Sequence, residues 1–398
     1  MRQMRLLGTL VGLACTASVA SAQQKATLSK PTAETKESFT NISSIRELPN
    51  GKVLLADRQD KVVQLIDLAS GSVTKVGREG NGPGEYAMPL ALAALPDGST
   101  LVHDLLNRRF LIIGSDGKPG GFLELPRPPA ANTGGGNGPV LIGGIQQVRG
   151  VDKQGRLYFR GSPFTATGGA ADSVPVLRWD RVKPNFDTVG YIKLPPNSAS
   201  QSRSGGNFTV RIGNNIRWTP TENWDVAGDG SVARVIPSPY HVIWLKDRGA
   251  PVSGPVVPYA PIKVTEADKQ EVIDAQKKNA NQGIRLSFGG PGGGGGGASP
   301  TSGNVQPPPP EFADTKPPFD GAAGNSVLAT PEGEVWVLRT RVFGDKVPTY
   351  DVFDHSGTLV KKVSLNPNSR VVGFGKGTVY VVRTDEDDLQ YLQRYARP

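Results

Sequence analysis

The stretch PNGKVLLAD, residues 49–57, contains the pattern that organises this chain. An X-Gly turn is followed by one polar or small residue and then by a run of mostly aliphatic, β-branched or aromatic residues. The template recurs as PDGSTLVHD (96–104), KQGRLYFRG (153–161), GDGSVARVI (228–236), PEGEVWVLR (331–339) and GKGTVYVVR (375–383). Such turns join adjacent strands, and runs of this composition favour strands. The sequence therefore predicts six related β-hairpin units.

A second apolar run follows the first one in each unit, as in VVQLIDLASG (62–71) and RFLIIGSDG (109–117). The first runs are apolar on both faces, so each strand is expected to be covered on both sides. The shortest spacings between turn glycines, 44 and 47 residues, match one four-stranded propeller blade, and the longer spacings fit insertions. The predicted fold class is all-β: a six-bladed β-propeller of four-stranded antiparallel blades.

The last unit has too few strands for a complete blade. After Gly377 only TVYVVRT and LQYLQRYAR remain, with RVVGFG before them. The segment KATLSKPTAETKESF (25–39) precedes the first complete unit and is weakly extended. A ring that takes strands for one blade from both ends of the chain leaves no open sheet edge. We therefore expect the N-terminal segment to be the fourth strand of the C-terminal blade.

Residues 264–319 interrupt the repeat. The insertion opens with VTEADKQEVIDAQKKNA (264–280), where Thr265 can cap a helix and Asp268 stands at its third position. The following GGPGGGGGGASPTSGNVQPPPP (289–310) has almost no apolar side chain to bury and is expected to be disordered. The insertion is thus predicted to be one helix plus a disordered Gly/Pro-rich tract. Its role is either that of a tolerated loop or that of a tether or lid over one mouth of the channel.

The N-terminus, MRQMRLLGTLVGLACTASVASA (1–22), has the basic start, short apolar run and small-x-small ending of a secretory signal peptide. Cleavage after Ala22 would leave residues 23–398 as one propeller domain and remove Cys15, the single cysteine. Cys15 is alternatively a lipid attachment site, although Gly12 stands where a lipobox usually carries Leu. An exported protein without disulfides suggests a bacterial envelope. The predicted location is periplasmic or extracellular.

Charge and hydropathy limit the partners. The formal net charge is +9, but export and the lack of basic blocks with interleaved aromatics argue against nucleic acid. A positive charge also serves general solubility and weak attraction to anionic surfaces. No stretch after the leader approaches the ~20 apolar residues of a membrane helix, so no membrane span is expected. The expected form is a monomer whose ligand is a protein or a carbohydrate.

The glycine-rich stretch GREGNGPGEY (77–86) raises the question of phosphate binding. A P-loop needs a Gly-Lys-Ser/Thr ending at the start of a helix, and a dinucleotide-binding loop also needs a following helix. The stretch lacks the Lys, Pro83 removes an amide donor, and a strand hairpin follows. It is predicted to carry the chain from the outer edge of one blade to the inner strand of the next, with anion binding as the alternative.

The same loop also carries a family resemblance. REGNGPGEY resembles the G-x-GPGE-aromatic loop that follows the first blade in bacterial six-bladed propeller proteins related to the NHL-repeat group. LADRQDKVVQLID (55–67) and HDLLNRRFLIIGSDG (103–117) look like the strand–Asp–turn–strand unit of that group. Units three and four depart from it, with Gly161 and Ile236 at the Asp position. The resemblance implies an exported bacterial propeller but no activity, because propellers host many unrelated functions.

Histidines are poorly arranged for a metal site. His103 lies on the strand after the turn glycine of unit two, His241 begins the next strand of unit four, and His355 lies in a turn of unit five. Equivalent positions would converge on one centre, but these positions differ. Each histidine is therefore expected to be bonded within the fold or exposed, with His103 kept as a candidate at the channel mouth.

Carboxylates and arginines occupy one repeated position. Asp57 and Asp104 both stand six residues after their turn glycines, and Arg339 and Arg383 stand at that offset in units five and six. These four residues are candidates for a polar channel mouth. Asp57 and Asp104 are also weak candidates for metal ligands, since Ca²⁺ prefers oxygen donors. The alternative is that each Asp bonds the backbone amides of the next turn.

Two functions from different classes remain open. The first is a non-catalytic binding or scaffolding propeller of the bacterial periplasm or cell surface, with no cofactor. The second is a metal-dependent propeller hydrolase, lactonase or lyase, with Asp57 and Asp104 at the channel mouth and Ca²⁺ as the metal. A Ca²⁺ ion held on the axis by these side chains would favour the enzyme. A channel lined by arginine or filled by apolar groups would favour the binding protein.

Overall fold

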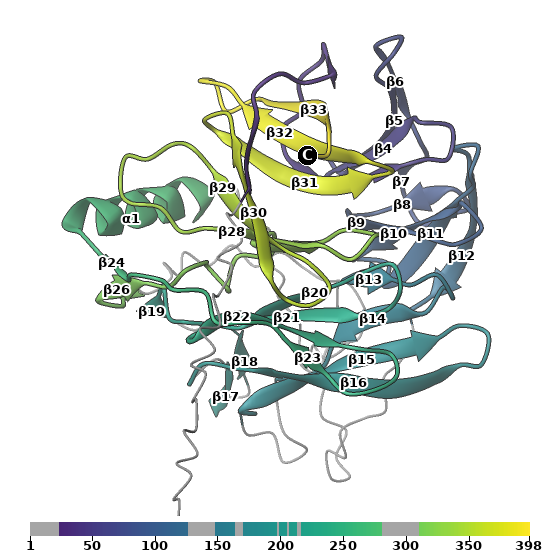
Figure 1. Cartoon of the computed structure of the whole chain (residues 1–398). Helices are drawn as coiled ribbons and strands as arrows, with labels where there is room; N and C mark the ends of the chain where they lie inside the picture. Colours follow the sequence, from purple (N-terminus) through teal and green to yellow (C-terminus); the bar gives the residue numbers. More distant parts are fainter. Residues whose placement is uncertain are drawn as a thin grey trace, which may run out of the picture.

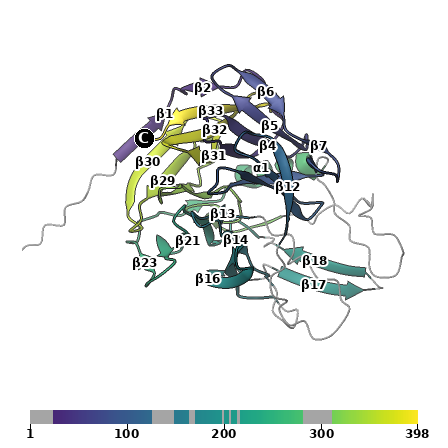
Figure 2. The same ribbon diagram turned by 90° about the vertical axis from the view of Figure 1, so that its right-hand side faces the viewer.

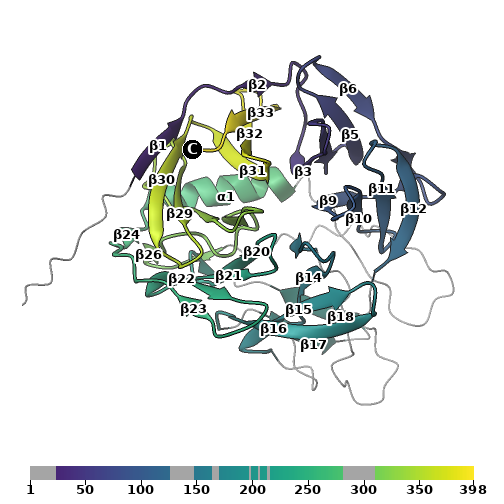
Figure 3. The same ribbon diagram turned by 45° about the vertical axis from the view of Figure 1, so that its right-hand side comes forward.

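The computed structural model describes residues 24–125, 148–163, 170–196, 199–204, 207–212, 216–280 and 310–398. Almost all of its regular structure is β-strand, and the described residues contain one helix, α1 (Glu266–Ala280). The strands form six small sheets arranged in a ring (Figures 1 and 3). The fold is a six-bladed β-propeller, as the repeated turns predict. The predicted signal peptide and the glycine-rich tract lie outside the described residues.

Each blade contains a four-stranded antiparallel unit, and Figure 3 shows the first strands at the centre of the ring and the fourth strands at its rim. Blade 1 contains β3 (Ile42–Glu47), β4 (Val53–Asp57), β5 (Val62–Asp67) and β6 (Ser72–Lys75). Blade 2 contains β9 (Pro89–Ala94), β10 (Thr100–Asp104), β11 (Arg109–Ile113) and β12 (Pro119–Glu124). Blade 3 contains β13 (Gly150–Val151), β14 (Leu157–Arg160), β15 (Ser173–Asp180) and β16 (Asn185–Lys193). Blade 4 contains β20 (Asn223–Val226), β21 (Val232–Pro237), β22 (Tyr240–Leu245) and β23 (Val252–Ser253). Blade 5 contains β27 (Val327–Ala329), β28 (Val335–Leu338), β29 (Thr349–Phe353) and β30 (Leu359–Leu365). The C-terminal part of the chain gives blade 6 the strands β31 (Ser369–Gly375), β32 (Thr378–Thr384) and β33 (Gln390–Ala396).

The six turn glycines explain why the template recurs. Each one joins the first strand of a blade to the second, and each has a positive φ between 66° and 96°, a conformation that costs glycine little. In blade 1, the amide of Gly51 donates to the carbonyl of Leu48, and the amide of Leu48 donates to the carbonyl of Lys52. The same pair of hydrogen bonds recurs in blades 2 to 5, so one turn geometry sets the register of five hairpins.

The hydrophobic core is divided among the seams between blades. The described residues form six clusters of buried apolar side chains, one for each pair of neighbouring blades. The second strands lie at the middle of this packing, and every residue of β4 and β10 is buried. The two-sided apolar runs of the sequence therefore arise because each sheet packs against a neighbour on both faces.

Buried tyrosines carry polar bonds across several of these seams. The Tyr240 hydroxyl of blade 4 donates to Asp351 of blade 5 over 3.0 Å. The Tyr350 hydroxyl of blade 5 accepts the amide of Val371 in blade 6 over 2.9 Å. Burial raises the pKa of Tyr350 to about 12, so the hydroxyl remains protonated at neutral pH. These directional bonds add register to seams whose apolar contacts alone would permit sliding.

The two ends of the chain close the ring, as the sequence predicts, but the N-terminal segment supplies two strands instead of one. β2 (Ala33–Glu34) pairs antiparallel with β33 and is the fourth strand of blade 6. β1 (Gln24–Leu28) pairs parallel with β30 and adds a fifth strand to blade 5. The N-terminal segment therefore covers the outer edges of two neighbouring blades, which Figure 3 shows along the rim.

One face of the ring carries the additional elements. We call it the crossing face, because there the chain passes from the outer strand of one blade to the inner strand of the next. The hairpin of β17 (Ala199–Ser204) and β18 (Asn207–Ile212) and helix α1 belong to such crossings, and Figures 2 and 3 place them on the same side of the ring. In Figure 3, α1 projects across the centre of the ring.

Short strand pairs and a buried ion pair hold the helical insertion. β24 (Ile262–Lys263) pairs with β26 (Thr315–Lys316), and β19 (Ile216–Arg217) pairs with β25 (Glu311–Phe312). The Asp268 carboxylate accepts hydrogen bonds from the amide and hydroxyl of Thr265, which confirms the predicted cap. Its other oxygen lies 2.5 Å from the Lys316 ammonium, and both side chains are buried. The insertion is therefore anchored at the start of α1.

Candidate mouth cavity at the centre of the ring

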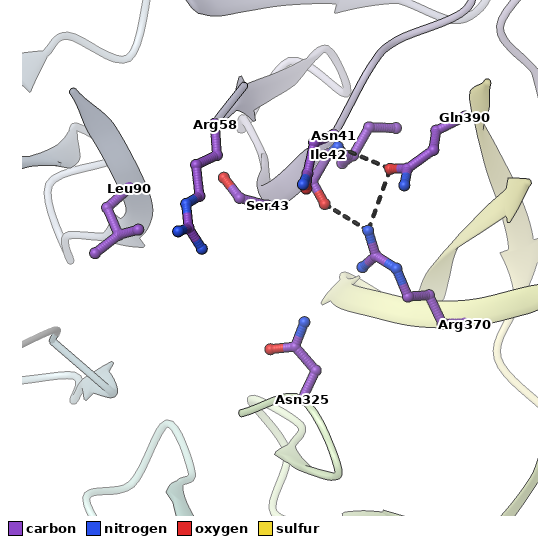
Figure 4. Close-up of a pocket in the computed structure, with 8 residues that line it drawn as sticks. All are labelled: Asn41, Ile42, Ser43, Arg58, Leu90, Asn325, Arg370 and Gln390. Carbon is purple, nitrogen blue, oxygen red and sulfur yellow. Dashed lines mark hydrogen bonds between the residues drawn. The ribbon is translucent and has the colours of Figure 1, made fainter. Parts of the chain in front are cut away.

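A cavity of about 390 Å³ lies at the centre of the crossing face (Figure 4). Its walls come from the inner strands of blades 1, 2 and 6 and from the approach to blade 5. We call it the mouth cavity. Its lining residues are Asn41, Ile42, Ser43, Arg58, Leu90, Asn325, Arg370 and Gln390. Two arginines, three carboxamides and one hydroxyl thus border it, and no acidic side chain is among them.

Arg370 is held in the wall by blade 1 and blade 6 together. One guanidinium nitrogen, Nη2, donates to the carbonyl of Ile42 over 2.6 Å and to Oε1 of Gln390 over 3.3 Å. The other, Nη1, is buried and has no hydrogen-bond partner. Burial lowers the pKa of Arg370 from its ordinary value, and within the described part of the chain no carboxylate pairs with it. The unpaired nitrogen leaves a buried donor at the wall.

Arg58 supplies the second charge from the opposite wall. It follows the last residue of β4, its side chain is exposed, and it forms no ion pair with any described residue. Figure 4 shows its guanidinium directed toward the space that Arg370 and Asn325 also border. The Gln390 amide oxygen already accepts the amide of Ile42 over 2.8 Å, so its nitrogen remains as a donor. The cavity is therefore rich in hydrogen-bond donors.

Further arginines surround the mouth on the side of blades 3 and 4. Arg149 donates to the carbonyl of Gly324 over 3.0 Å and to the side chain of Asn223 over 3.4 Å. Arg160 keeps part of its surface in contact with solvent. The pKa of Arg160 is lowered mainly because the protein around it displaces water, and secondly because the positive charge of Arg149 lies nearby. Asp225 is an acid on this side, and burial raises its pKa while Arg149 opposes that rise. Arg149 and Arg160 therefore add positive charge beside the two arginines that line the cavity.

Asp57, one of the candidate metal ligands, connects two loops of blade 1. One carboxylate oxygen accepts the amides of Thr40 and Asn41, each over 2.9 Å. The other accepts the amides of Gln59 and Asp60 over 2.9 and 3.0 Å. The side chain is completely buried. Its oxygens therefore hold the crossing loop against the turn after β4, and a metal ion would have to displace these bonds.

Asp104, the second candidate ligand, also bonds the crossing loop that leads into its blade, blade 2. One oxygen accepts the amides of Ala87 and Met88 over 3.1 and 3.0 Å. The other accepts the side-chain amide of Asn107 over 2.7 Å and lies 3.9 Å from the Arg109 guanidinium. Asp57 thus bonds backbone amides of the next turn, which is the alternative to metal binding that the sequence leaves open. Asp104 instead bonds the amides of the preceding crossing loop and reaches the next turn through the side chain of Asn107.

The two arginines at the same offset occupy different surroundings. Arg339 lies 2.8 Å from Asp351 at the seam between blades 4 and 5, and its guanidinium stacks near the Tyr259 ring at 5.1 Å. Arg383 pairs with Glu34 of β2 over 2.5 Å and therefore connects blade 6 to the N-terminal strand. Neither side chain lines the mouth cavity.

The three histidines lie apart from one another and from the cavity. His103 is buried, and neither ring nitrogen has a hydrogen-bond partner; burial lowers its pKa to about 4. His241 lies beside the carbonyl of Pro239 at 2.7 Å, and His355 lies beside the carbonyl of Glu332 at 2.7 Å. The described residues contain no group of three or more His, Cys, Asp or Glu side chains that could hold a metal ion.

The loop 77–86 is the blade crossing that the sequence predicts, since it joins β6 to β9. Within it, the Glu85 carboxylate accepts the amide of Gly82 over 2.7 Å and pairs with Arg78 at 2.6 Å. These two interactions lower the pKa of Glu85. The hydroxyl of Tyr86 bonds the backbone of Val63 and of residue 76. The carboxylate of the loop therefore occupies donors that an external phosphate would need.

The cavity residues escaped sequence reasoning for a geometric reason. The repeat was aligned on the run after each turn glycine, and that run is the second strand of its blade. The centre of the ring is bordered instead by the first strand and its flanking loops, where Ser43, Leu90 and Arg370 lie. The sequence does place both arginines beside repeated features. Arg370 lies in SRVVGFG, the run before the turn glycine of blade 6, and Arg58 directly follows the repeated Asp57.

Comparison with known proteins found distant structural neighbours and no relative by sequence. No family model and no curated protein matches this chain. A Bacteroides fragilis protein shares 12% identity over 94% of this chain and 100% of its own, with a TM-score of 0.47. Regucalcin, a calcium-binding protein of Agrobacterium tumefaciens, shares 11% over 94% and 95%, with a TM-score of 0.42. A gluconolactonase of Xanthomonas campestris shares 9% over 91% of each chain, with a TM-score of 0.40.

At these identities and TM-scores, the calcium binding and lactonase activity of those proteins give no argument about this chain. The class that its own strand order defines is the six-bladed β-propeller. Among the described residues, no helix is both long enough and apolar enough to span a membrane.

Proposed function

We propose that this protein is a non-catalytic binding propeller of the bacterial periplasm or cell surface, with its ligand site in the mouth cavity. The observation that supports this proposal is the lining of the cavity. It consists of Arg58, Arg370, three carboxamides, one hydroxyl and two aliphatic side chains, with no carboxylate among the lining residues. A channel mouth lined by arginine is the arrangement that favours binding over metal-assisted hydrolysis. Binding needs only complementary groups around a concave site.

The chemistry of the mouth supports the same choice. General acid–base or nucleophilic catalysis needs a base within hydrogen-bond reach of the reacting group. The lining residues offer guanidinium, carboxamide, hydroxyl and aliphatic groups, and the Ser43 hydroxyl lies 3.1 Å from the carbonyl of Ala56. A Ca²⁺-dependent hydrolase remains the second candidate, with Asp57 and Asp104 as ligands. It requires both carboxylates to exchange backbone bonds for the metal.

The proposal also includes export to the bacterial envelope and membership of the NHL-repeat group of propellers. The leader at residues 1–22 supports export, and the G-x-GPGE-aromatic loop supports kinship with the NHL-repeat group of propellers. The hydrogen bonds of Glu85 and Tyr86 give that loop motif a structural reason. The expected form remains a monomer with a single propeller domain over residues 23–398.

A turnover assay separates the two candidates. Purified protein is tested for hydrolysis of lactone and ester substrates in the presence of Ca²⁺ and again after removal of divalent ions with EDTA. The binding function predicts no Ca²⁺-dependent turnover and the same background for the wild type, Asp57→Asn and Asp104→Asn proteins. Turnover that needs Ca²⁺ and disappears in both variants would overturn the proposal in favour of the hydrolase.

A further inference from the structure

We propose that the mouth cavity selects a small organic oxyanion, bearing a carboxylate or a phosphate, and holds it between Arg58 and Arg370. This inference rests on the proposed function and names the chemical class of its ligand. The two guanidinium groups belong to different blades, and neither pairs with an acidic side chain of the described residues. Figure 4 shows both groups bordering the same space.

The donor and acceptor balance of the cavity points to an anion. A guanidinium has five N–H donors and no acceptor. Nη1 of Arg370 is buried without a partner, and an unsatisfied buried donor is costly to a fold. The Gln390 oxygen is already occupied by Ile42 and Arg370, which leaves its nitrogen to face a ligand. A ligand that supplies acceptors and negative charge therefore complements this wall.

The acids nearest to this wall, Asp57 and Asp60, form no ion pair with Arg58 or Arg370 among the described residues. Asp57 is the carboxylate bonded to the wall residue Asn41, and its two oxygens accept four backbone amides while the side chain is completely buried. Asp60 accepts the hydroxyl of Thr40 over 3.0 Å. Both acids are therefore engaged within the loops of blade 1. The volume of about 390 Å³ falls in the range of sites for small organic ligands.

Arg58 and Arg108 provide a matched pair of variants. Arg58 lies in the turn after β4, Arg108 lies in the corresponding turn after β10, and both side chains are exposed. Arg58 lines the mouth cavity and Arg108 does not. Arg58→Gln and Arg108→Gln therefore remove the same charge from equivalent loops, and neither change disturbs a buried contact. Arg370→Lys is the third variant, which keeps the charge but loses the two-nitrogen fork.

Calorimetric titration at constant ionic strength tests the inference with charged and neutral probes. Succinate is compared with its neutral diamide, succinamide, and glycerol 3-phosphate is compared with glycerol. We expect at least one anion to bind and both neutral probes to bind at least about tenfold more weakly. Arg58→Gln should weaken anion binding about tenfold, the order expected for one charge-assisted contact, and Arg108→Gln should leave it unchanged.

Each outcome decides the inference. Preference for succinate or for glycerol 3-phosphate identifies the carboxylate or the phosphate as the selected group. Equal binding of charged and neutral probes, equal effects of Arg58→Gln and Arg108→Gln, or no heat with either anion would overturn it. These results would leave the proposed binding function standing. That function is overturned by a different result, namely Ca²⁺-dependent turnover that is lost in the Asp57 and Asp104 variants.

Discussion

The seam between blades 6 and 1 and the seam between blades 2 and 3 contain comparable apolar clusters but differ in polar chemistry. At the first seam, the Glu47 carboxylate of blade 1 accepts the Tyr380 hydroxyl over 2.6 Å and the Thr378 hydroxyl over 2.8 Å, both from blade 6. On the strand of blade 2 that packs toward the second seam, His103 is buried without a partner for either ring nitrogen.

The difference reflects how each seam is assembled. Blade 6 takes β31 to β33 from the C-terminal end of the chain and β2 from the N-terminal end, so its position depends on non-covalent bonds. Directional bonds to the half-buried Glu47 carboxylate fix that position more tightly than apolar contact alone. Blades 2 and 3 follow one another in the chain and assemble without a join between the two termini. The hydrogen bonds of Glu47 therefore reinforce the seam at which the two ends of the chain meet.

Removal of both N-terminal strands should have the largest effect on this comparison. Deletion of residues 24–36 exposes the edge of β33 and removes the closing pairs of blade 6. We expect a loss of several kcal/mol in the free energy of unfolding, measured by denaturant titration, and aggregation through the freed edge. Deletion of residues 24–30, which removes only β1 from blade 5, should cost less. A truncated protein that unfolds like the full chain and stays monomeric would contradict closure by the termini.

His103 should make stability depend on pH. Its pKa is lowered by burial from 6.5 to about 4, so the unfolded chain binds the proton more readily between these values. Stability should therefore be unaffected above pH 6.5 and fall as the pH drops from 6.5 to 4, by about 3 kcal/mol in total.

The control for this pH dependence is the less buried His241. His103→Leu should flatten the stability profile between pH 4 and 6.5, and His241→Gln should leave the profile as in the wild type. The free energy of unfolding is measured by urea titration at each pH. An unchanged slope in His103→Leu would show that another group titrates.

Glu47→Ala should weaken the seam between blades 6 and 1 by about 2 kcal/mol, because two hydroxyl donors lose a charged acceptor. The exposed Glu37→Ala serves as the control and should change stability little. A double-mutant cycle with Tyr380→Phe measures the coupling between Glu47 and Tyr380 directly. Additive effects of the two substitutions would mean that the bond does not stabilise the seam.

The smallest expected effect belongs to the ion pair between Arg383 and Glu34. Both side chains are about one-third exposed, at 34% and 32%. Arg383→Gln should cost about 0.5 kcal/mol and lose part of even that cost at high salt. Thermal unfolding at low and high ionic strength measures it. A loss comparable to that of Glu47→Ala would show that β2 is held mainly by its side chains instead of its backbone.

Particular residues show how far sequence reasoning extends. The cap formed by Thr265 and Asp268 could be predicted because helix caps depend on neighbours in the chain. The partner of Asp268 could not, since Lys316 is 48 residues away.

The sequence by itself determined the repeated unit, the number of blades, the closure of the last blade by the N-terminal segment and the crossing role of loop 77–86. Each of these follows from local rules: turn glycines, two-sided apolar runs and the need to cover a sheet edge. The strand added to blade 5, the polar latches at the seams and the mouth cavity depended on the tertiary structure. Arg58 and Arg370 are 312 positions apart, and a cavity between distant side chains has no periodicity in the chain that forms it.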